Sequence, residues 1–124
     1  MIEVEVENRS GEDVDVDGAV ELARRVLGGE GIEAGELGLQ FVGPDEIRAL
    51  KREHLGVDEA TDALAFPLDG TNELPPELPR QLGDVVVCPH VVGESWRAPL
   101  VHALLHLLGH DHGGEMEARE ALYR

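Results

Sequence analysis

The 124-residue sequence predicts a single α+β domain. A chain of this length suits one domain with one core, and its hydrophobic share of 42% is that of a globular protein. Apolar residues repeat with strand and helix periods in the order βαβαββααα, which lacks the strict alternation of a doubly wound sheet. We therefore expect one domain over residues 1–124, in which a mixed four-stranded sheet packs with about five helices.

The first half of the chain alternates between strands and helices. Apolar residues at every second position predict strands at Ile2–Val6 and Leu37–Phe41. Between them, Val16–Val26 follow helical spacing, and the glycine pair 28–29 is a natural helix stop. A second helix opens at Gly43-Pro44, because proline is tolerated in a first helical turn and acidic residues there favour the positive end of the dipole. Its apolar side consists of Ile47, Leu50 and Leu55.

Two short, strongly apolar segments, Ala63–Pro67 and Asp84–Cys88, complete the predicted sheet. The segment between them, Asp69–Gln81, holds three prolines and is expected to be an exposed, irregular loop.

The last third of the chain is helical in period. A short helix is expected at His90–Glu94 and a final one at Glu115–Tyr123. The stronger helix, Pro99–Leu108, is apolar on nearly every side except for two histidines. Such all-round apolarity indicates a buried central helix.

Charge and composition narrow the class of protein. The formal net charge of −16 argues against broad affinity for nucleic acid, although the acidity lies mostly outside residues 84–112, which hold five of the six histidines. The single cysteine, Cys88, excludes an internal disulfide and is typical of a reducing compartment. No apolar run approaches a membrane span and the N-terminus has no signal-peptide pattern, so we expect a cytoplasmic protein with no membrane partner.

The chemistry is carried by a histidine-rich segment. His102 and His106 are four residues apart on the predicted helix, so both rings project from one face and can reach one zinc ion. Gly109 allows the chain to leave the helix and turn back, which brings His112 round as a third ligand. Three protein nitrogens leave a fourth position open, the arrangement of a catalytic zinc site with about one zinc per chain.

The neighbouring residues have less specific interpretations. Because His110 lies two residues from a proposed ligand, we interpret it as a packing residue rather than a ligand. Asp111 is either a partner that orients a ligand ring or a turn residue. His54 and His90 are interpreted as ordinary surface or packing residues.

The histidine spacing is that of the metzincin proteases, but one catalytic residue of a protease is missing. A zinc protease places its general-base glutamate directly after the first histidine, where this chain has Ala103. Peptide hydrolysis is therefore the weakest alternative. Phosphodiester cleavage makes other demands, an activated oxygen nucleophile and a stabilised phosphorane, and a metal ion contributes to both.

Three motifs resemble those of one known family. The stretch HALLHLLGHDH (102–112) is similar to the H-x3-H-L-x-G-(H or Y)-D-H signature of the bacterial YbeY family of endoribonucleases and rRNA maturation factors. The strand TDALAFP (61–67) resembles the family's PT(D/N)VLSFP, and LGDVVVC (82–88) resembles its LGD(I/L)VIC. The spacing of elements agrees as far as Met116 and Glu120, so the resemblance covers nearly the whole chain.

The resemblance implies a function as well as a fold. It implies an α+β fold, zinc held by His102, His106 and His112, cleavage of single-stranded RNA, and a role in 16S rRNA 3′-end maturation and ribosome biogenesis. It also implies a small-subunit ribosomal protein and a ribosome-associated GTPase as partners. The catalytic role is assigned to the three histidines through the zinc, and no separate general base is assigned.

This chain departs from the family pattern at the expected phosphate-binding position. The run HLGVD (54–58) has Leu55 where the family has an arginine thought to contact the RNA phosphate, and leucine cannot bind a phosphate. Ala65 replaces the family's serine, and the connection from Cys88 to His102 is short. Arg52 and Arg97 are candidates to restore the lost charge. The alternative function is therefore a non-catalytic, zinc-stabilised ribosome-assembly factor.

Overall fold

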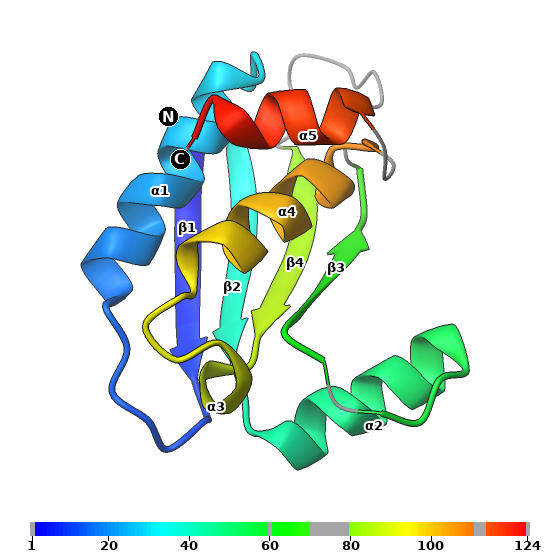
Figure 1. Ribbon diagram of the computed structural model, residues 1–124. Helices are drawn as coiled ribbons and strands as arrows, with labels where there is room; N and C mark the ends of the chain where they lie inside the picture. Colours follow the sequence, from blue (N-terminus) through cyan, green and yellow to red (C-terminus); the bar gives the residue numbers. More distant parts are fainter. Residues whose placement is uncertain (1, 60, 70–79, 111–113, 124) are drawn as a thin grey trace.

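The computed structural model describes residues 2–59, 61–69, 80–110 and 114–123 (Figure 1). Its elements, in chain order, are β1 (Ile2–Asn8), α1 (Val16–Gly29), β2 (Gly35–Phe41), α2 (Pro44–Leu55), β3 (Ala63–Pro67), β4 (Gln81–Val87), α3 (Pro89–Val92), α4 (Arg97–Leu107) and α5 (Gly114–Ala121). The α+β fold class and the mixed four-stranded sheet predicted from the sequence are confirmed.

The strands form one sheet in the order β1-β2-β4-β3. β1, β2 and β4 are parallel, which requires the crossovers that α1 and α2 supply. β3 pairs with β4 in the antiparallel direction and forms one edge of the sheet. This edge lies next to α4, which crosses the sheet in Figure 1.

Alternation along each strand divides the sheet into two faces. The face that carries Leu39, Phe41, Val85 and Val87 packs against α1 and α4 and holds the larger core. The opposite face carries a smaller cluster in which α2 covers part of β3 and β4; its buried members are Val42, Ile47, Leu64, Val86 and Cys88. The rest of that face carries Glu5, Glu7, Gln40 and Asp84, and the glutamates of β1 are exposed, so this face is covered only in part.

α4 is the central helix of the larger core. It packs against α1, α5, β3 and β4. Within residues 101–108 every side chain except His102 and His106 is buried. The predicted buried helix, apolar except for two histidines, is therefore confirmed.

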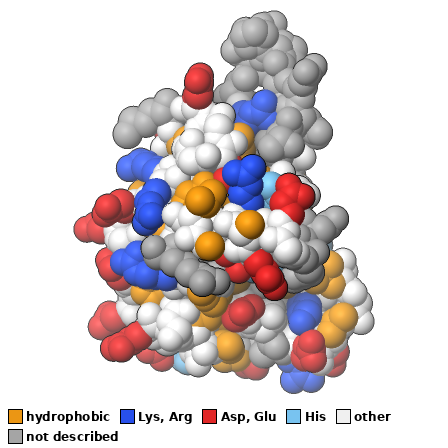
Figure 2. All heavy atoms as spheres, turned by 45° about the horizontal axis from the view of Figure 1, so that its top comes forward, with side chains coloured by type: hydrophobic (Ala, Val, Ile, Leu, Met, Phe, Trp, Pro, Cys, Tyr) orange, Lys and Arg blue, Asp and Glu red, His pale blue; other side chains and the backbone are white. Residues whose placement is uncertain are grey.

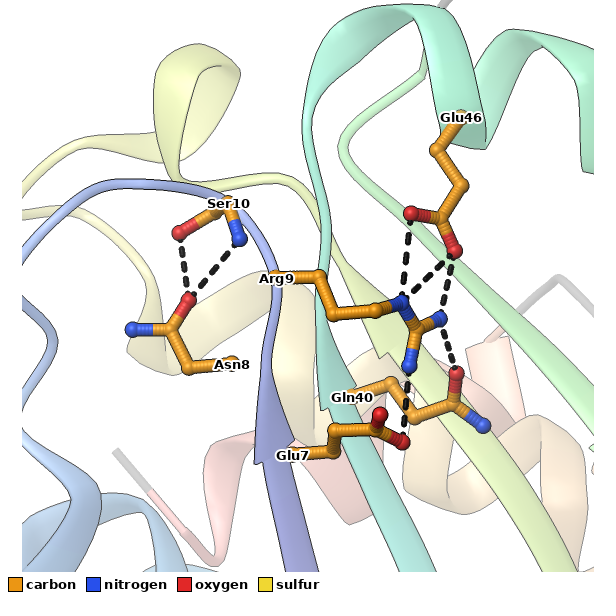
Figure 3. Close-up of polar contacts among 6 residues, drawn as sticks. All are labelled: Glu7, Asn8, Arg9, Ser10, Gln40 and Glu46. Atoms are coloured by element: carbon orange, nitrogen blue, oxygen red, sulfur yellow. Dashed lines mark hydrogen bonds and ion pairs between the residues drawn. The ribbon is translucent and has the colours of Figure 1, made fainter.

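An arginine cluster fixes the beginning of α2 against the sheet (Figure 3). Arg9, which follows β1, donates from Nε to Glu46 at 3.2 Å and from Nη2 to Gln40 at 2.7 Å, and pairs with Glu7 at 2.7 Å. The bonds to Glu46 and Glu7 raise the pKa of the Arg9 guanidinium above its ordinary value. The cluster thereby ties the first turn of α2 to the ends of β1 and β2.

β4 begins earlier than the sequence suggested, at Gln81 rather than Asp84. The reason is Gly83, whose φ of 132° accommodates a shift in register against β2. The shift breaks the apolar alternation on which the sequence prediction depended, and it allows Leu82 to be fully buried in the larger core.

The remaining bounds differ from expectation by a few residues. α3 ends at Val92 rather than Glu94, and α4 begins at Arg97 rather than at Pro99. α5 ends at Ala121, two residues before the predicted end at Tyr123. Most of the expected loop Asp69–Gln81 lies outside the described residues. Over the described ranges, no helix is both long and apolar enough to cross a membrane.

Candidate metal centre and its cleft

Two of the three predicted ligands lie side by side. His102 and His106 are one helical turn apart on α4, and their Nε2 atoms approach to 3.1 Å. The rings meet edge to face, with centroids 4.6 Å apart. Each ring therefore directs the same nitrogen toward a common point beside the helix.

This geometry fits two ligands of one zinc ion. Zn–N bonds of about 2.0–2.1 Å at a tetrahedral angle separate two ligand nitrogens by about 3.3 Å. The observed Nε2–Nε2 distance of 3.1 Å is close to that value. The pair suits a ligand set in which both imidazoles use Nε2.

The other nitrogen of His102 is held by an acidic residue. Nδ1 of His102 bonds to Oε1 of Glu120, which lies on α5. A carboxylate on the remote ring nitrogen of a zinc-binding histidine fixes the tautomer with a free Nε2 and makes that nitrogen more basic. With Nδ1 held by Glu120, Nε2 of His102 is the ring nitrogen left without a proton, which is the state that a metal ligand requires.

Three residues that follow α4 were considered from the sequence: His110, Asp111 and His112. Both Asp111 and His112, the candidate orienting partner and the predicted third ligand, lie outside the described residues. In the part of the chain that is described, no three His, Cys, Asp or Glu side chains are grouped to hold a metal ion. His110 does not face the histidine pair; its Nε2 lies 3.0 Å from Oε1 of Glu30, at the end of α1.

A cleft of about 470 Å³ adjoins the histidine pair. One wall is α4, with Pro99, His102, Ala103 and His106, and the other is the segment Thr61–Ala65 that includes most of β3. Leu55 reaches it from the end of α2. The side chains of Ala63 and Ala65 face α4, and their small size leaves this space between the helix and the sheet.

The cleft holds little positive charge. The described residues that line it include no lysine or arginine. Leu55, which stands at the expected phosphate-binding position, is 59% exposed. Arg52 lies 3.8 Å from Asp58, and the guanidinium of Arg97 lies over the ring of Trp96 at 4.6 Å, so neither candidate replacement lines the cleft.

The other cations of α2 are also paired with acids in the loop that follows the helix. Arg48 donates to Asp58 at 2.7 Å and Lys51 to Glu59 at 2.9 Å. The hydrogen bond from Arg48 holds the pKa of the exposed Asp58 carboxyl below its ordinary value.

Figure 2 shows the face that comes forward when the top of Figure 1 is tilted toward the viewer, with acidic side chains spread among basic and apolar ones.

The two remaining histidines contact protein groups. The ring of His54 lies 4.9 Å from that of Phe66, and His90 bonds through Nε2 to the carbonyl oxygen of Ser10 at 3.1 Å. These contacts agree with the interpretation of both as surface or packing residues.

Comparison with known proteins gives one family. A family model described as Endoribonuclease YbeY matches residues 5–123. The chain is 37% identical over 137 residues to the Endoribonuclease YbeY of Salinispora tropica, across 94% of this chain and 87% of the relative. It is 41% identical over 95 residues to that of Halorhodospira halophila, across 68% of this chain and 62% of the relative.

A solved structure has a similar fold. The solution structure of TM1509 from Thermotoga maritima matches with a TM-score of 0.58 and 25% sequence identity. The match covers 99% of this chain and 86% of that chain.

Proposed function

The chain belongs to the YbeY endoribonuclease family, and from that premise we propose that it cleaves single-stranded RNA with a zinc ion held by His102, His106 and His112. The observation that carries the proposal is the convergence of the two Nε2 atoms, 3.1 Å apart, on the wall of a cleft. The bond between Glu120 and His102 supports it, because a histidine that lies loosely on a surface has no need of a fixed tautomer.

The histidines would hold the metal, and the rest of the chain would form the surroundings of the reacting phosphate. When bound, zinc supplies Lewis-acid polarisation of a phosphoryl oxygen and lowers the pKa of a bound water toward about 7. His102 and His106 present their nitrogens from the rigid helix α4, and Glu120 orients the first of them. Thr61–Ala65 form the opposite wall, and a cleft of about 470 Å³ suits one nucleotide unit of a single strand.

The cellular role that we propose follows from the family. It is the processing of rRNA, specifically 16S rRNA 3′-end maturation, within ribosome biogenesis. The proposed partners are single-stranded rRNA, the small ribosomal subunit and a ribosome-associated GTPase, and the proposed location is the cytoplasm. These assignments rest on the family resemblance rather than on a contact in the described residues.

The test is metal-dependent cleavage of RNA. Purified protein would be incubated with a labelled single-stranded RNA and with the same RNA annealed to its complement. Each sample would be assayed as purified, after chelation, and after zinc is restored. We expect cleavage of the single strand alone, lost on chelation and recovered with zinc. Cleavage that persists unchanged in the chelated protein would refute a zinc-dependent nuclease.

A non-catalytic assembly factor is the second candidate function. Two observations favour it: Leu55 at the expected phosphate-binding position, and a cleft whose described lining includes no lysine or arginine. Such a protein would use zinc for folding alone. Zinc-dependent thermal stability without any turnover of RNA by the zinc-loaded protein would identify this function and exclude the nuclease.

Replacing Glu120 with glutamine is expected to weaken zinc binding by about 10- to 100-fold. Glutamine keeps the size of the side chain but removes the negative charge that holds Nδ1 of His102. Zinc affinity would be measured by competition with a coloured chelator. Glu117→Gln, an exposed position on the same helix, is the matched control and should bind zinc like the wild type. Equal affinity of all three proteins would contradict the orienting role.

Replacing Leu55 with arginine is expected to tighten the binding of single-stranded RNA by about 5- to 150-fold. The side chain is exposed at the mouth of a cleft whose described lining lacks a cation, and a charge-assisted pair with phosphate contributes about 1–3 kcal/mol. RNA affinity would be measured by fluorescence anisotropy. Leu122→Arg adds the same charge at a similarly exposed position just after α5 and should change affinity far less. Equal gains in both variants would show a general charge effect.

A further inference from the structure

We propose that a second cleft, at the other end of the sheet from α5, binds a small organic cation, an amine carried on an apolar body. The cleft has a volume of about 350 Å³. It lies between the connection from β1 to α1 on one side and α3 with the residues that follow it on the other. Among the described residues it shares none with the lining of the cleft beside His102 and His106, so the inference is independent of the proposed nuclease.

The cleft lies at the carboxyl ends of parallel strands. Phe41 and Val87, the last residues of β2 and β4, line it. Figure 1 shows α3 and the β1–α1 connection at the arrowhead end of β1, β2 and β4, with α5 at the opposite end. Trp96, which lines the cleft and precedes α4, lies about 9 Å along the helix axis from His102 and about 15 Å from His106. Ligands of open α/β sheets bind in the crevice outside the carboxyl ends of the strands, and this cleft occupies that place.

Most of the lining is apolar. Its buried members belong to the larger core: Ala19, Phe41 and Val87. Its half-buried members pack against that core: Val14, Val92 and Trp96. Sites for small ligands are typically lined in this way and have volumes of about 300–1,000 Å³. The cleft therefore suits an aliphatic or aromatic body.

The charged side chains of the lining are all carboxylates. Glu12, Asp13 and Asp15 belong to the β1–α1 connection, and Glu94 follows α3. All four residues are exposed, so their charges lie toward the mouth of the cleft. The described lining includes no lysine, arginine or histidine. Carboxylates on both walls favour a ligand whose polar end is positive.

Two of the four carboxylates are left to bind a ligand. Glu12 pairs with His90 at 3.3 Å, and Asp15 caps the first turn of α1. Asp13 and Glu94 have no ion pair and no side-chain hydrogen bond with another described residue. These two acids lie on opposite walls, so a single cation between them can pair with both.

Hydrogen bonds hold the two walls in a fixed shape. The side-chain oxygen of Asn8 accepts from the backbone N–H and the hydroxyl of Ser10 at 3.0 and 2.6 Å, as Figure 3 shows. The Ser10 hydroxyl in turn accepts from the backbone N–H of Glu12 at 3.1 Å. His90 of α3 connects the walls, with Nε2 3.1 Å from the carbonyl oxygen of Ser10 and Nδ1 3.3 Å from Glu12. A preformed site loses little conformational freedom when a ligand binds.

The short helix α3 leaves the cleft open. It has only four residues, and Gly93 ends it with a φ of 54°. A Cβ atom added to Gly93 would have no heavy atom within 4 Å, so the space beside this lining residue is empty of protein.

Other occupants fit the cleft less well. A second copy of this chain, with a net charge of −16, and the phosphates of a nucleic acid would both be repelled by the acidic mouth. The described His, Cys, Asp and Glu side chains form no group of three that could hold a metal ion. The neighbouring cation Arg97 lies over the ring of Trp96 at 4.6 Å and is not a lining residue, so it does not fill the cleft.

The experiment measures binding through the fluorescence of Trp96, which lines the cleft and is the only tryptophan in the chain. The probes share one apolar body: 4-phenylbutylamine, the neutral 4-phenylbutanol and the anionic 5-phenylpentanoate. We expect saturable binding of the amine, about 3- to 10-fold tighter than that of the alcohol, because two solvent-exposed ion pairs distinguish them. The anion should bind more weakly than the alcohol, and added salt should reduce these differences.

A double variant, Asp13→Asn with Glu94→Gln, removes the two carboxylates that have no other partner. It should lower the affinity for the amine to that for the alcohol and leave the affinity for the alcohol unchanged. The matched control, Glu33→Gln with Glu115→Gln, removes the same charge before β2 and on α5. It should keep the preference for the amine. All four side chains are exposed, so both double variants should fold like the wild type.

The outcomes decide the inference whether or not the protein cleaves RNA. A preference for the amine that is lost with Asp13 and Glu94 but kept in the control supports it. Equal binding of amine and alcohol, or no saturable change in Trp96 fluorescence, overturns it. A preference lost equally in both double variants would reflect the overall charge of the chain and would also overturn it. Binding of a lysine-flanked phenylalanine peptide without binding of the free amine would replace the small ligand with a protein partner.

Discussion

His106→Ala is expected to abolish zinc binding and RNA cleavage together while leaving the fold in place. The residue supplies one of two nitrogens that converge beside α4, and two remaining ligands hold zinc poorly. Loss of a Lewis acid that supplies several kcal/mol should lower cleavage by more than about 1,000-fold. The fold should survive, because the side chain is only partly buried and alanine is the best helix former.

Zinc content by elemental analysis, cleavage of labelled single-stranded RNA and thermal unfolding of the metal-free protein would be measured on the same preparations. His90→Ala is the matched control, since the described bonds of this histidine go to Ser10 and Glu12, in the connection between β1 and α1. It should retain zinc and cleavage. If wild type and His106→Ala cleave at the same rate, the activity belongs to a contaminant.

Gly83→Ala is expected to be the most damaging small substitution in the fold. Its φ of 132° is accessible to glycine but strained for alanine, and a Cβ atom there would lie 2.3 Å from the carbonyl oxygen of Phe66. Backbone strain of about 1–3 kcal/mol, with a similar cost for the clash, gives a loss of about 2–6 kcal/mol. A typical domain has only about 5–15 kcal/mol in total.

Urea unfolding followed by circular dichroism would measure this loss. Gly28→Ala provides the comparison, because this glycine lies in α1 with no heavy atom within 4 Å of an added Cβ atom and has an ordinary helical conformation. That substitution should stabilise the protein by about 0.5–1 kcal/mol. If Gly83→Ala unfolds at the same urea concentration as the wild type, the strand pair β3–β4 must be able to separate at little cost.

The fold was predictable where the apolar residues follow a strand or helix period without interruption. Alternating residues in β1 and β2 and the apolar stretch of α4 gave the correct element types and the α+β class. Prediction was wrong at the start of β4, because the register shift at Gly83 reverses the side to which Leu82 points. A shift of this kind depends on the neighbouring strand, which the local sequence does not describe.

The site was predictable only in part. The spacing of His102 and His106 on one helix brings their rings together wherever that helix is placed, so the pair could be found from sequence alone. The carboxylate partner of His102 was missed, because Glu120 lies 18 residues away on another helix. A signal existed: Glu120 lies four residues after the buried Met116 on α5 and therefore on the same face, and a charge on such a face requires a partner.

The burial of the Glu30 side chain, which is 5% exposed, was missed for a similar reason. Glu30 follows a glycine pair that was interpreted as a helix stop, and its negative charge there looked like one more solvated acid among many. Its partners lie at His110 and beyond Gly114, so only the packing of α1 against the C-terminal part of the chain shows that it is buried.

The histidine pair shares α4 with the side chains that form the centre of the larger core. Leu100, Leu104 and Leu105 are fully buried on the same eleven-residue helix that carries His102 and His106. Amide hydrogens in such a helix exchange with solvent only when most of the molecule opens. A local opening that releases His102 or His106 would also expose the core leucines, so α4 amides should be among the slowest to exchange, with or without metal. Binding of a metal ion would then slow exchange mainly outside α4, because the two histidines on α4 need no further ordering.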